Sequence, residues 1–286
     1  MKIAIIGSSG MLGNIVFNYF LMFAKDIRII IPMKYNLDNK NEFISSLENA
    51  DFVINCSGAI PQKMPDSTSI ITKQNYFKIN YLLPELLLEN NFKVIHPCTD
   101  CVYKGSPHLA PYGIDSDFDC DDLYGKSKAC LYSRNTYHIN IDLIRVIRAS
   151  IIAPDKSNKS LYSWTLSSIK ASHLIFGYIN HFWNGITALK WAEIALQIIY
   201  NFDSFPPISV YGTNTISKYE LIKNILIVNN LSPDKLLKPK KAMHTLNKSL
   251  ILGENNFGDI FNLLVELKEF EDLINKNFET SNIAYK

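Results

Sequence analysis

The sequence predicts an α/β fold: a doubly wound parallel sheet with a smaller C-terminal lobe. In the first half of the chain, short β-branched runs alternate with longer amphipathic stretches. The short runs are almost entirely apolar, which is typical of parallel strands covered on both faces. Regular alternation of strands and helices implies right-handed βαβ units. After Pro154 the alternation becomes irregular, which indicates a second, smaller unit.

The expected elements follow the chain in order. The predicted strands of the first half are Ile3–Ile6, Arg28–Ile31, Phe52–Asn55, Lys93–His96 and Asp142–Ile147. The predicted helices between them are Met11–Lys25, Asn41–Asn49, Thr72–Asn90 and Leu123–Tyr137. Beyond Pro154 we expect a strand at Ile208–Tyr211, an irregular aromatic stretch at His173–Trp183, and helices at Leu161–Ala171, Ala188–Phe202, Lys218–Val228 and Phe261–Phe278.

These elements suggest two domains. Residues 1–150, with a return segment at about 186–211, would form the sheet domain. Residues 151–185 and 212–286 would form the lobe. Strands that alternate with helices in this way are typical of a Rossmann-type sheet.

Composition excludes several classes of partner. The 286 residues include 29 basic and 27 acidic side chains, a net charge of +2, so no electrostatic argument favours nucleic acid or an anionic membrane. Five cysteines in a chain of this size indicate reduced thiols and a cytoplasmic compartment. The apolar run at the N-terminus stops at Gly7, well short of a signal peptide or a membrane span.

A glycine-rich loop follows the first expected strand and opens the first helix. Gly7, Gly10 and Gly13 have the spacing Gly-x-x-Gly-x-x-Gly. Glycines let a backbone turn sharply and approach a pyrophosphate, whose charge then lies at a helix N-terminus. The second strand leads to Lys34 and lacks the carboxylate that NAD-specific sites place there. A lysine suits a 2′-phosphate, so we expect NADP(H), with NAD(H) as the alternative.

Two Tyr-x-x-x-Lys pairs occur, Tyr124 with Lys128 and Tyr219 with Lys223. This spacing puts both side chains on one helix face, where the ammonium would lower the pKa of the tyrosine. Only the first pair follows a strand that ends in a hydroxyl residue, Thr99. Because ligands of doubly wound sheets bind at the carboxyl ends of strands, we assign catalysis to Tyr124, Lys128 and Thr99.

One cysteine pair has the spacing of a redox or metal half-site. Cys98 and Cys101 have the Cys-x-x-Cys spacing, but no second pair accompanies them. A zinc site needs four ligands. We therefore expect no metal.

Several motifs occur in an order that resembles a known family. They are the glycine loop, Asn55-Cys56-Ser57-Gly58-Ala59, Asn80, Thr99-Asp100-Cys101-Val102-Tyr103, and Tyr124-Gly125-Lys126-Ser127-Lys128. Together they look like the extended short-chain dehydrogenase/reductases, and the branch most resembled is the dTDP-4-dehydrorhamnose reductase-like sugar reductases. The resemblance is specific up to about Pro154 and looser through residues 164, 180–187 and 211–212.

The resemblance implies a reaction and a set of contacts. NADPH would reduce the 4-keto group of a dTDP- or UDP-linked 4-keto-6-deoxy sugar, with an N-acetylamino sugar as a variant, and Tyr124 would donate the proton. The cofactor would contact Gly7, Ser9, Gly10, Met11, Leu12, Lys34, Cys56, Ser57, Gly58, Asn80, Cys98, Tyr124 and Lys128. The substrate would contact Thr99, Asp100, Cys101, Arg148, Asn180, His181, Trp183 and Asn184.

Alternatives stay open at this point. Cys101 stands where related dehydratases have a glutamate, which disfavours dehydration, and it could instead be the base of a 3- or 3,5-epimerase/reductase. A catalytically silent NAD(P)-binding subunit is a third reading, which the intact Tyr124, Lys128 and Thr99 argue against. A homodimer is compatible with the resemblance.

Overall fold

The computed structural model describes residues 1–64, 69–132, 140–172 and 174–284. At its centre is a six-stranded, fully parallel sheet in the order β10-β5-β4-β3-β1-β2. The strands are β1 (Lys2–Ile6), β2 (Arg28–Ile30), β3 (Phe52–Asn55), β4 (Val94–Cys98), β5 (Ile144–Arg148) and β10 (Ile208–Val210). The prediction of a Rossmann-type doubly wound sheet is confirmed.

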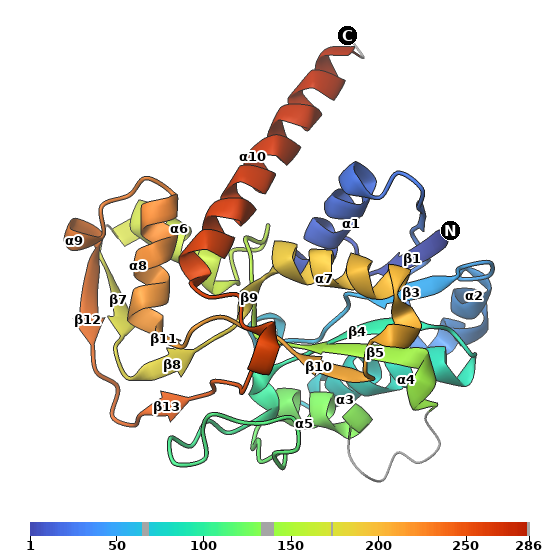
Figure 1. The fold of residues 1–286 in the computed structure, drawn as a ribbon, viewed down its shortest axis with the longest axis horizontal. Helices are drawn as coiled ribbons and strands as arrows, with labels where there is room; N and C mark the ends of the chain where they lie inside the picture. The colour runs from blue at the N-terminus through green and yellow to red at the C-terminus, as the bar shows by residue number, and fades with distance from the viewer. Residues whose placement is uncertain (65–68, 133–139, 173, 285–286) are drawn as a thin grey trace.

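Helices cover both faces of this sheet (Figure 1). On one face lie α1 (Met11–Phe23) and α7 (Ala188–Tyr200), which pack against each other. On the other lie α3 (Ile70–Phe77), α4 (Leu83–Glu89) and α5 (Leu123–Ala129), and α2 (Lys40–Ser45) follows β2 near the sheet edge.

Alternate side chains of β1 point into the two apolar clusters on opposite faces of the sheet. Ile3 and Ile5 belong to the apolar cluster on the α1 and α7 side, while Ala4 and Ile6 belong to the cluster on the opposite side. Both faces of the strand are buried, which explains its unbroken apolar sequence.

Two predicted helices differ from the observed ones. The expected helix Thr72–Asn90 is interrupted by a π-helical turn, Lys78–Leu82, which joins α3 to α4. The expected helix Leu123–Tyr137 is helical to Ala129, continues as a 3₁₀ turn to Tyr132, and its remainder lies outside the described residues. A π turn inserts one residue into the helical register and re-aims the side chains it carries, here including Asn80.

The second unit is built from helices and short strands (Figure 1). Its helices are α6 (Leu161–Ser172), α8 (Lys218–Val228), α9 (Pro233–Leu236) and α10 (Ile260–Ala284), and α10 projects away from the body. The stretch expected to be irregular contains β7 (Ile175–Tyr178), paired with β12 (Leu237–Lys240), and β8 (His181–Trp183), flanked by β11 (Ile216–Ser217) and β13 (Leu246–Asn247). The two units are connected through β6 (Ile151–Ile152), which pairs with β9 (Ile186–Thr187).

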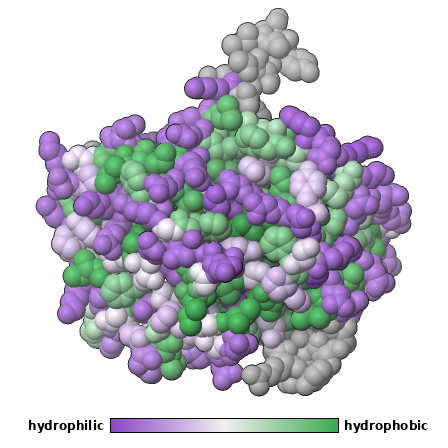
Figure 2. Space-filling view, in the orientation of Figure 1, coloured by the Kyte–Doolittle hydropathy of each residue, from purple (hydrophilic) through white to green (hydrophobic). Residues whose placement is uncertain are grey.

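On the face drawn in Figure 2, apolar side chains lie interspersed with hydrophilic ones, as is normal for a surface in contact with water. Among the described helices, none combines the length and the apolar character that a membrane crossing requires.

Candidate active site

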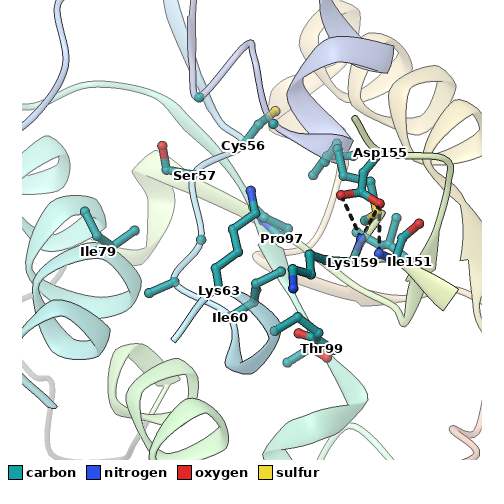
Figure 3. Close-up of a pocket in the computed structure, with 18 of the residues that line it drawn as sticks. Cys56, Ser57, Ile60, Lys63, Ile79, Pro97, Thr99, Ile151, Asp155 and Lys159 are labelled. Atoms are coloured by element: carbon teal, nitrogen blue, oxygen red, sulfur yellow. Dashed lines mark hydrogen bonds between the residues drawn. The ribbon is translucent and has the colours of Figure 1, made fainter. Parts of the chain in front are cut away.

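A cavity of about 890 Å³ opens at the carboxyl ends of the central strands (Figure 3). Strand order reverses around β1, which has β2 on one side and β3 on the other, and such a switch point is where doubly wound sheets bind ligands. Cys56 and Ser57 lie on one wall, and Asp155 lies on the other with its hydrogen bonds to Lys159. The cavity therefore lies between the sheet and the second unit.

The glycine loop forms one end of this cavity. Gly7 has a φ of 74°, and a Cβ there would lie 2.7 Å from the Ser57 Oγ. Gly10 N donates to Gly7 O over 2.9 Å, which closes the turn. Gly10 is also the N-cap of α1 and supplies no side-chain cap, so the first amides of the helix face the cavity uncapped by a side chain. The loop has the shape and polarity of an anion cradle.

Most residues predicted to bind a cofactor line the cavity. They are Gly7, Ser9, Gly10, Met11, Leu12, Lys34, Cys56, Ser57, Gly58, Cys98, Tyr124 and Lys128. Asn80 is different: it is fully buried behind the wall, where its amide pairs with both Ala59 N and Ala59 O at 3.0 Å and donates to Ser127 Oγ over 2.9 Å. Asn80 thus holds the backbone after β3 in place.

Thr99 directly follows β4 and caps the short 3₁₀ turn Asp100–Val102. Its Oγ1 accepts from Cys101 N at 3.2 Å and donates to Asp100 Oδ1 at 3.0 Å. The Thr99 hydroxyl also acts to lower the pKa of the Tyr124 phenol, so the two side chains are neighbours. The two hydroxyls predicted to act together therefore lie side by side.

Helix α5 is brought to this position by a close approach at Gly125. A Cβ on Gly125 would lie 2.3 Å from Cys101 O, so only glycine lets α5 approach the turn this closely. Asp122 accepts from Gly125 N at 2.8 Å and caps the helix. This contact places Tyr124 beside Thr99, and the i, i+4 spacing puts Lys128 on the same face.

The pKa of Tyr124 differs from the expectation that Lys128 would lower it. The pKa of Tyr124 is raised well above its usual value, by burial first and then by Cys101 and Asp100, and the Thr99 hydroxyl only partly opposes this. Burial lowers the pKa of Lys128 to about 8, and its ammonium donates to Pro97 O over 3.2 Å. Tyr124 is therefore a protonated phenol at neutral pH, which is the state of a proton donor.

Cys101 lies at the same corner. Burial and the neighbouring Asp100 carboxylate raise the pKa of Cys101 to about 12, although Lys248 and Thr99 act in the opposite direction. Its Sγ donates to Asp100 Oδ1 over 3.6 Å. At neutral pH it is a thiol, and a thiol is a poor base.

The predicted substrate contacts divide into two groups. Thr99, Asp100, Cys101 and Trp183 line the cavity. Arg148, Asn180, His181 and Asn184 are not among its lining residues.

Internal contacts explain the position of the second group. Arg148 is 1% exposed and donates to Tyr103 Oη over 3.0 Å. The Asn180 amide bonds the backbone of Ala242, and the Asn184 amide bonds both backbone groups of Leu250. Asn180 and Asn184 thus hold segments of the lobe together, and their buried amides are satisfied within the chain.

Several residues of the cavity wall were not predicted from the sequence. Lys63 ends the 3₁₀ turn Pro61–Lys63 that follows β3, and Lys218 is the first residue of α8. Asp155 organises the loop before α6: although burial opposes ionisation, hydrogen bonds from Ser157, Ser160 and Lys159 lower its pKa to about 2. An Asp-x-Ser sequence at a loop was the available signal for this turn.

Several solved structures have a fold similar to that of this chain. The chain is similar to a dTDP-4-dehydrorhamnose reductase of Clostridium acetobutylicum, with a TM-score of 0.74 and 18% identity over 96% of this chain and 100% of the other. The chain shares this fold. A reductase of the same name from Bacillus anthracis, in complex with NADP, matches at TM-score 0.74 and 13% identity, over 93% and 98% of the two chains.

A dTDP-glucose 4,6-dehydratase of B. anthracis, in complex with NAD, matches at TM-score 0.72 and 13% identity, over 95% and 96%. No family model and no curated protein matches the sequence. The likeness to the resembled family is thus one of fold across nearly the whole chain.

Proposed function

We propose that this protein is an NADPH-dependent reductase of the 4-keto group of a nucleoside-diphosphate-linked 4-keto-6-deoxy sugar. The observation that supports this most is that Thr99 and Tyr124 are neighbours and line the same cavity as the glycine loop. The fold shared with dTDP-4-dehydrorhamnose reductases supports the choice of substrate class.

The cavity residues fit a nicotinamide dinucleotide. The pyrophosphate would lie over the loop from Gly7 to Gly13, where a Cβ on Gly7 would fill the cradle and the amides of α1 are uncapped by a side chain. Lys34, exposed at the cavity wall, would pair with a 2′-phosphate, which favours NADPH over NADH. Lys128 would bond the ribose next to the nicotinamide. When bound, the nicotinamide supplies the hydride.

The chain's own groups supply the proton and hold the carbonyl. Tyr124 donates its phenolic proton to the carbonyl oxygen as that oxygen becomes an alkoxide. Thr99 would turn its single hydroxyl hydrogen from Asp100 Oδ1 to the same oxygen, and the bond that its Oγ1 accepts from Cys101 N keeps the hydroxyl in place. A positioned general acid of this kind is worth roughly 10²–10⁴ in rate.

The second unit would hold the nucleotide and the sugar. Its residues 151–185 and 212–286 supply Asp155, Lys159, Trp183 and Lys218 to the cavity wall opposite the sheet. A nucleotide sugar bound between the units would place its keto carbon over the nicotinamide face. We leave dTDP and UDP as alternatives for the nucleotide.

We do not extend the proposal to epimerisation. Removing a proton from a sugar carbon requires a base, and Cys101 is a protonated thiol with a pKa of about 12. In D₂O, the reduced sugar should therefore carry no solvent deuterium at C3 or C5. Deuterium at either carbon that disappears in Cys101→Ser would instead establish the epimerase/reductase.

The test of the function is a product analysis. The protein is incubated with dTDP-4-keto-6-deoxyglucose and NADPH, and the mass of the sugar nucleotide is measured by mass spectrometry. The expected product is two hydrogens heavier than the substrate. Tyr219→Phe removes the hydroxyl from the other Tyr-x-x-x-Lys pair and should behave as wild type, whereas Tyr124→Phe should not. A wild type that binds NADPH but reduces neither the dTDP- nor the UDP-linked keto sugar would support the silent-subunit reading.

A further inference from the structure

The two-stranded sheet of β7 and β12 has one covered face and one open face. On the covered face, Ile175 and Leu237 are buried in an apolar cluster with residues of α6 and α8. A Cβ on Gly177 would lie 2.7 Å from Tyr219 Cα, so the strand lies directly against α8. Alternate residues of both strands point the other way. Figure 1 shows this sheet at the periphery of the second unit, on the side away from the central sheet.

Aromatic and cationic side chains are paired across the open face. The parallel register sets Phe176 beside Lys238 and Tyr178 beside Lys240, and all four residues are exposed. Phe176 is 54% exposed, and the Lys240 ammonium lies 5.8 Å from the centre of the Tyr178 ring. Aromatic side chains that served only to stabilise the fold would be buried in it. The interior of the protein therefore gives no reason for aromatic residues at these two positions.

Two aliphatic side chains extend the apolar part of this surface. Ile179 directly follows β7 and is 43% exposed, and Met243 lies in the loop after β12 and is 92% exposed. The Asn180 amide ties these segments together, since it accepts from Ala242 N at 2.9 Å and donates to Ala242 O at 3.0 Å. The loop is thus held beside the sheet with the Met243 side chain in water, which is unfavourable for an apolar group.

The charge of this surface is of one sign. Residues 174–183 and 235–248, which form it, include five lysines and no carboxylate. Lys238, Lys240 and Lys241 are exposed, and in the ranges that the structure describes none of the three forms an ion pair. The overall charge of +2 gives no sign of such a surface, because carboxylates elsewhere in the chain balance these lysines. The surface is therefore locally electropositive and complementary to an anionic partner.

We propose that this basic–aromatic patch, made of Phe176, Tyr178, Lys238, Lys240 and Met243, docks on the surface of an anionic lipid bilayer. The lysines would pair with the headgroups, the two rings would lie at the level of the headgroups, and the methionine would enter the acyl boundary. The methionine decides between partners, because a nucleic acid would use the cations and the rings but offers nothing to an exposed aliphatic chain.

This proposal revises one expectation and is independent of another. The balanced overall charge led us to expect no anionic membrane as a partner, and the local charge of the patch gives the opposite indication. A patch of this kind lies on a bilayer and does not cross it. None of the five patch residues lines the cavity between the units, so docking leaves the cavity open. The proposal therefore stands whether or not the protein is a sugar-nucleotide reductase.

The test is cosedimentation with lipid vesicles. One set is made of phosphatidylcholine alone and the other of phosphatidylcholine with phosphatidylglycerol. Wild type should bind the anionic vesicles far more tightly than the neutral ones, and the binding should weaken as salt is added. Each lysine near an anionic surface is worth about fivefold in binding, so Lys238→Gln combined with Lys240→Gln should weaken it about twenty-five-fold. Met243→Ser should weaken it about tenfold.

A matched double variant separates the patch from the general charge of the protein. Lys170→Gln combined with Lys223→Gln removes two exposed lysines from α6 and α8 of the same unit and should bind as wild type does. The proposal is overturned if wild type does not bind the anionic vesicles or if this control loses as much as the patch variant. A Met243→Ser protein that binds like wild type also overturns it, because the lysines would then serve any polyanion. Reduction of the keto sugar in solution should be the same in wild type and in all these variants.

Discussion

The packing at Gly13 makes a sharp prediction about cofactor binding. A Cβ added at Gly13 would lie 2.1 Å from Gly7 O, 2.7 Å from Gly7 C and 2.8 Å from Ser8 Cα. All three are backbone atoms, so no side chain can rotate aside. Ordinary contact begins at 3.4 Å, and the loop must therefore withdraw from α1 by about 1.3 Å.

A withdrawal of that size would stretch the hydrogen bonds between the loop and a pyrophosphate beyond their useful range. Losing two charge-assisted bonds weakens binding by at least about a hundredfold, so Gly13→Ala should raise the Kd for NADPH by that factor. The assay is a fluorescence titration of NADPH, with circular dichroism to check the fold. The control is Gly113→Ala, whose Cβ would lie an ordinary 3.6 Å from Ile251 Cδ1. A folded Gly13→Ala protein that binds NADPH within about threefold of wild type would refute the reasoning.

Three further changes test other parts of the site. Lys34→Ala should weaken NADPH binding about tenfold and leave NADH binding unchanged. Equal losses for the two cofactors would show that Lys34 does not bind the 2′-phosphate. Burial raises the pKa of Glu271 on α10 to about 7, so its ionised form is disfavoured in the fold and stability falls as the pH rises from about 4.5 through 7. Glu271→Gln should therefore raise Tm at pH 8 but not at pH 4, and a gain that is independent of pH would contradict this. Lys128 has its pKa lowered to about 8 by burial, so its charge opposes folding below pH 8 and this penalty fades as the pH rises toward about 10.4. Lys128→Met should raise Tm at pH 7, with a smaller gain at pH 10, and slow reduction; a lowered Tm at pH 7 would show that the bond to Pro97 O outweighs the burial of the charge.

The sheet could be predicted from the sequence because its strands are buried on both faces. Ile3–Ile6 is apolar throughout and Phe52–Asn55 is apolar up to its last residue, as expected where helices cover both sides, so the unbroken apolar runs identified these strands. The short strands of the second unit escaped prediction for the opposite reason. In β7, Ile175 and Gly177 are buried while Phe176 and Tyr178 are exposed, so an exposed aromatic alternates with a buried residue and the hydropathy pattern disappears.

The site was predictable where backbone geometry requires a residue type. Gly7 and Gly13 are glycines because a side chain would collide with the backbone, and Thr99 caps a turn at a strand end. The direction in which a side chain points was not predictable. Asn184 looks like a ligand-binding amide in the sequence, yet its side chain pairs with the Leu250 backbone. Lys218, at the start of α8, lines the cavity, and β11 before it pairs with β8, a long-range contact that the sequence does not show.

The central claim is that Tyr124 donates the proton in an NADPH-dependent reduction. It is tested most directly by single-turnover oxidation of bound NADPH with dTDP-4-keto-6-deoxyglucose, followed by absorbance at saturating substrate. Tyr124→Phe should slow this step by roughly 10²–10⁴, with NADPH affinity preserved and Tyr219→Phe as fast as wild type. A Tyr124→Phe protein that oxidises NADPH at the wild-type rate would contradict the account.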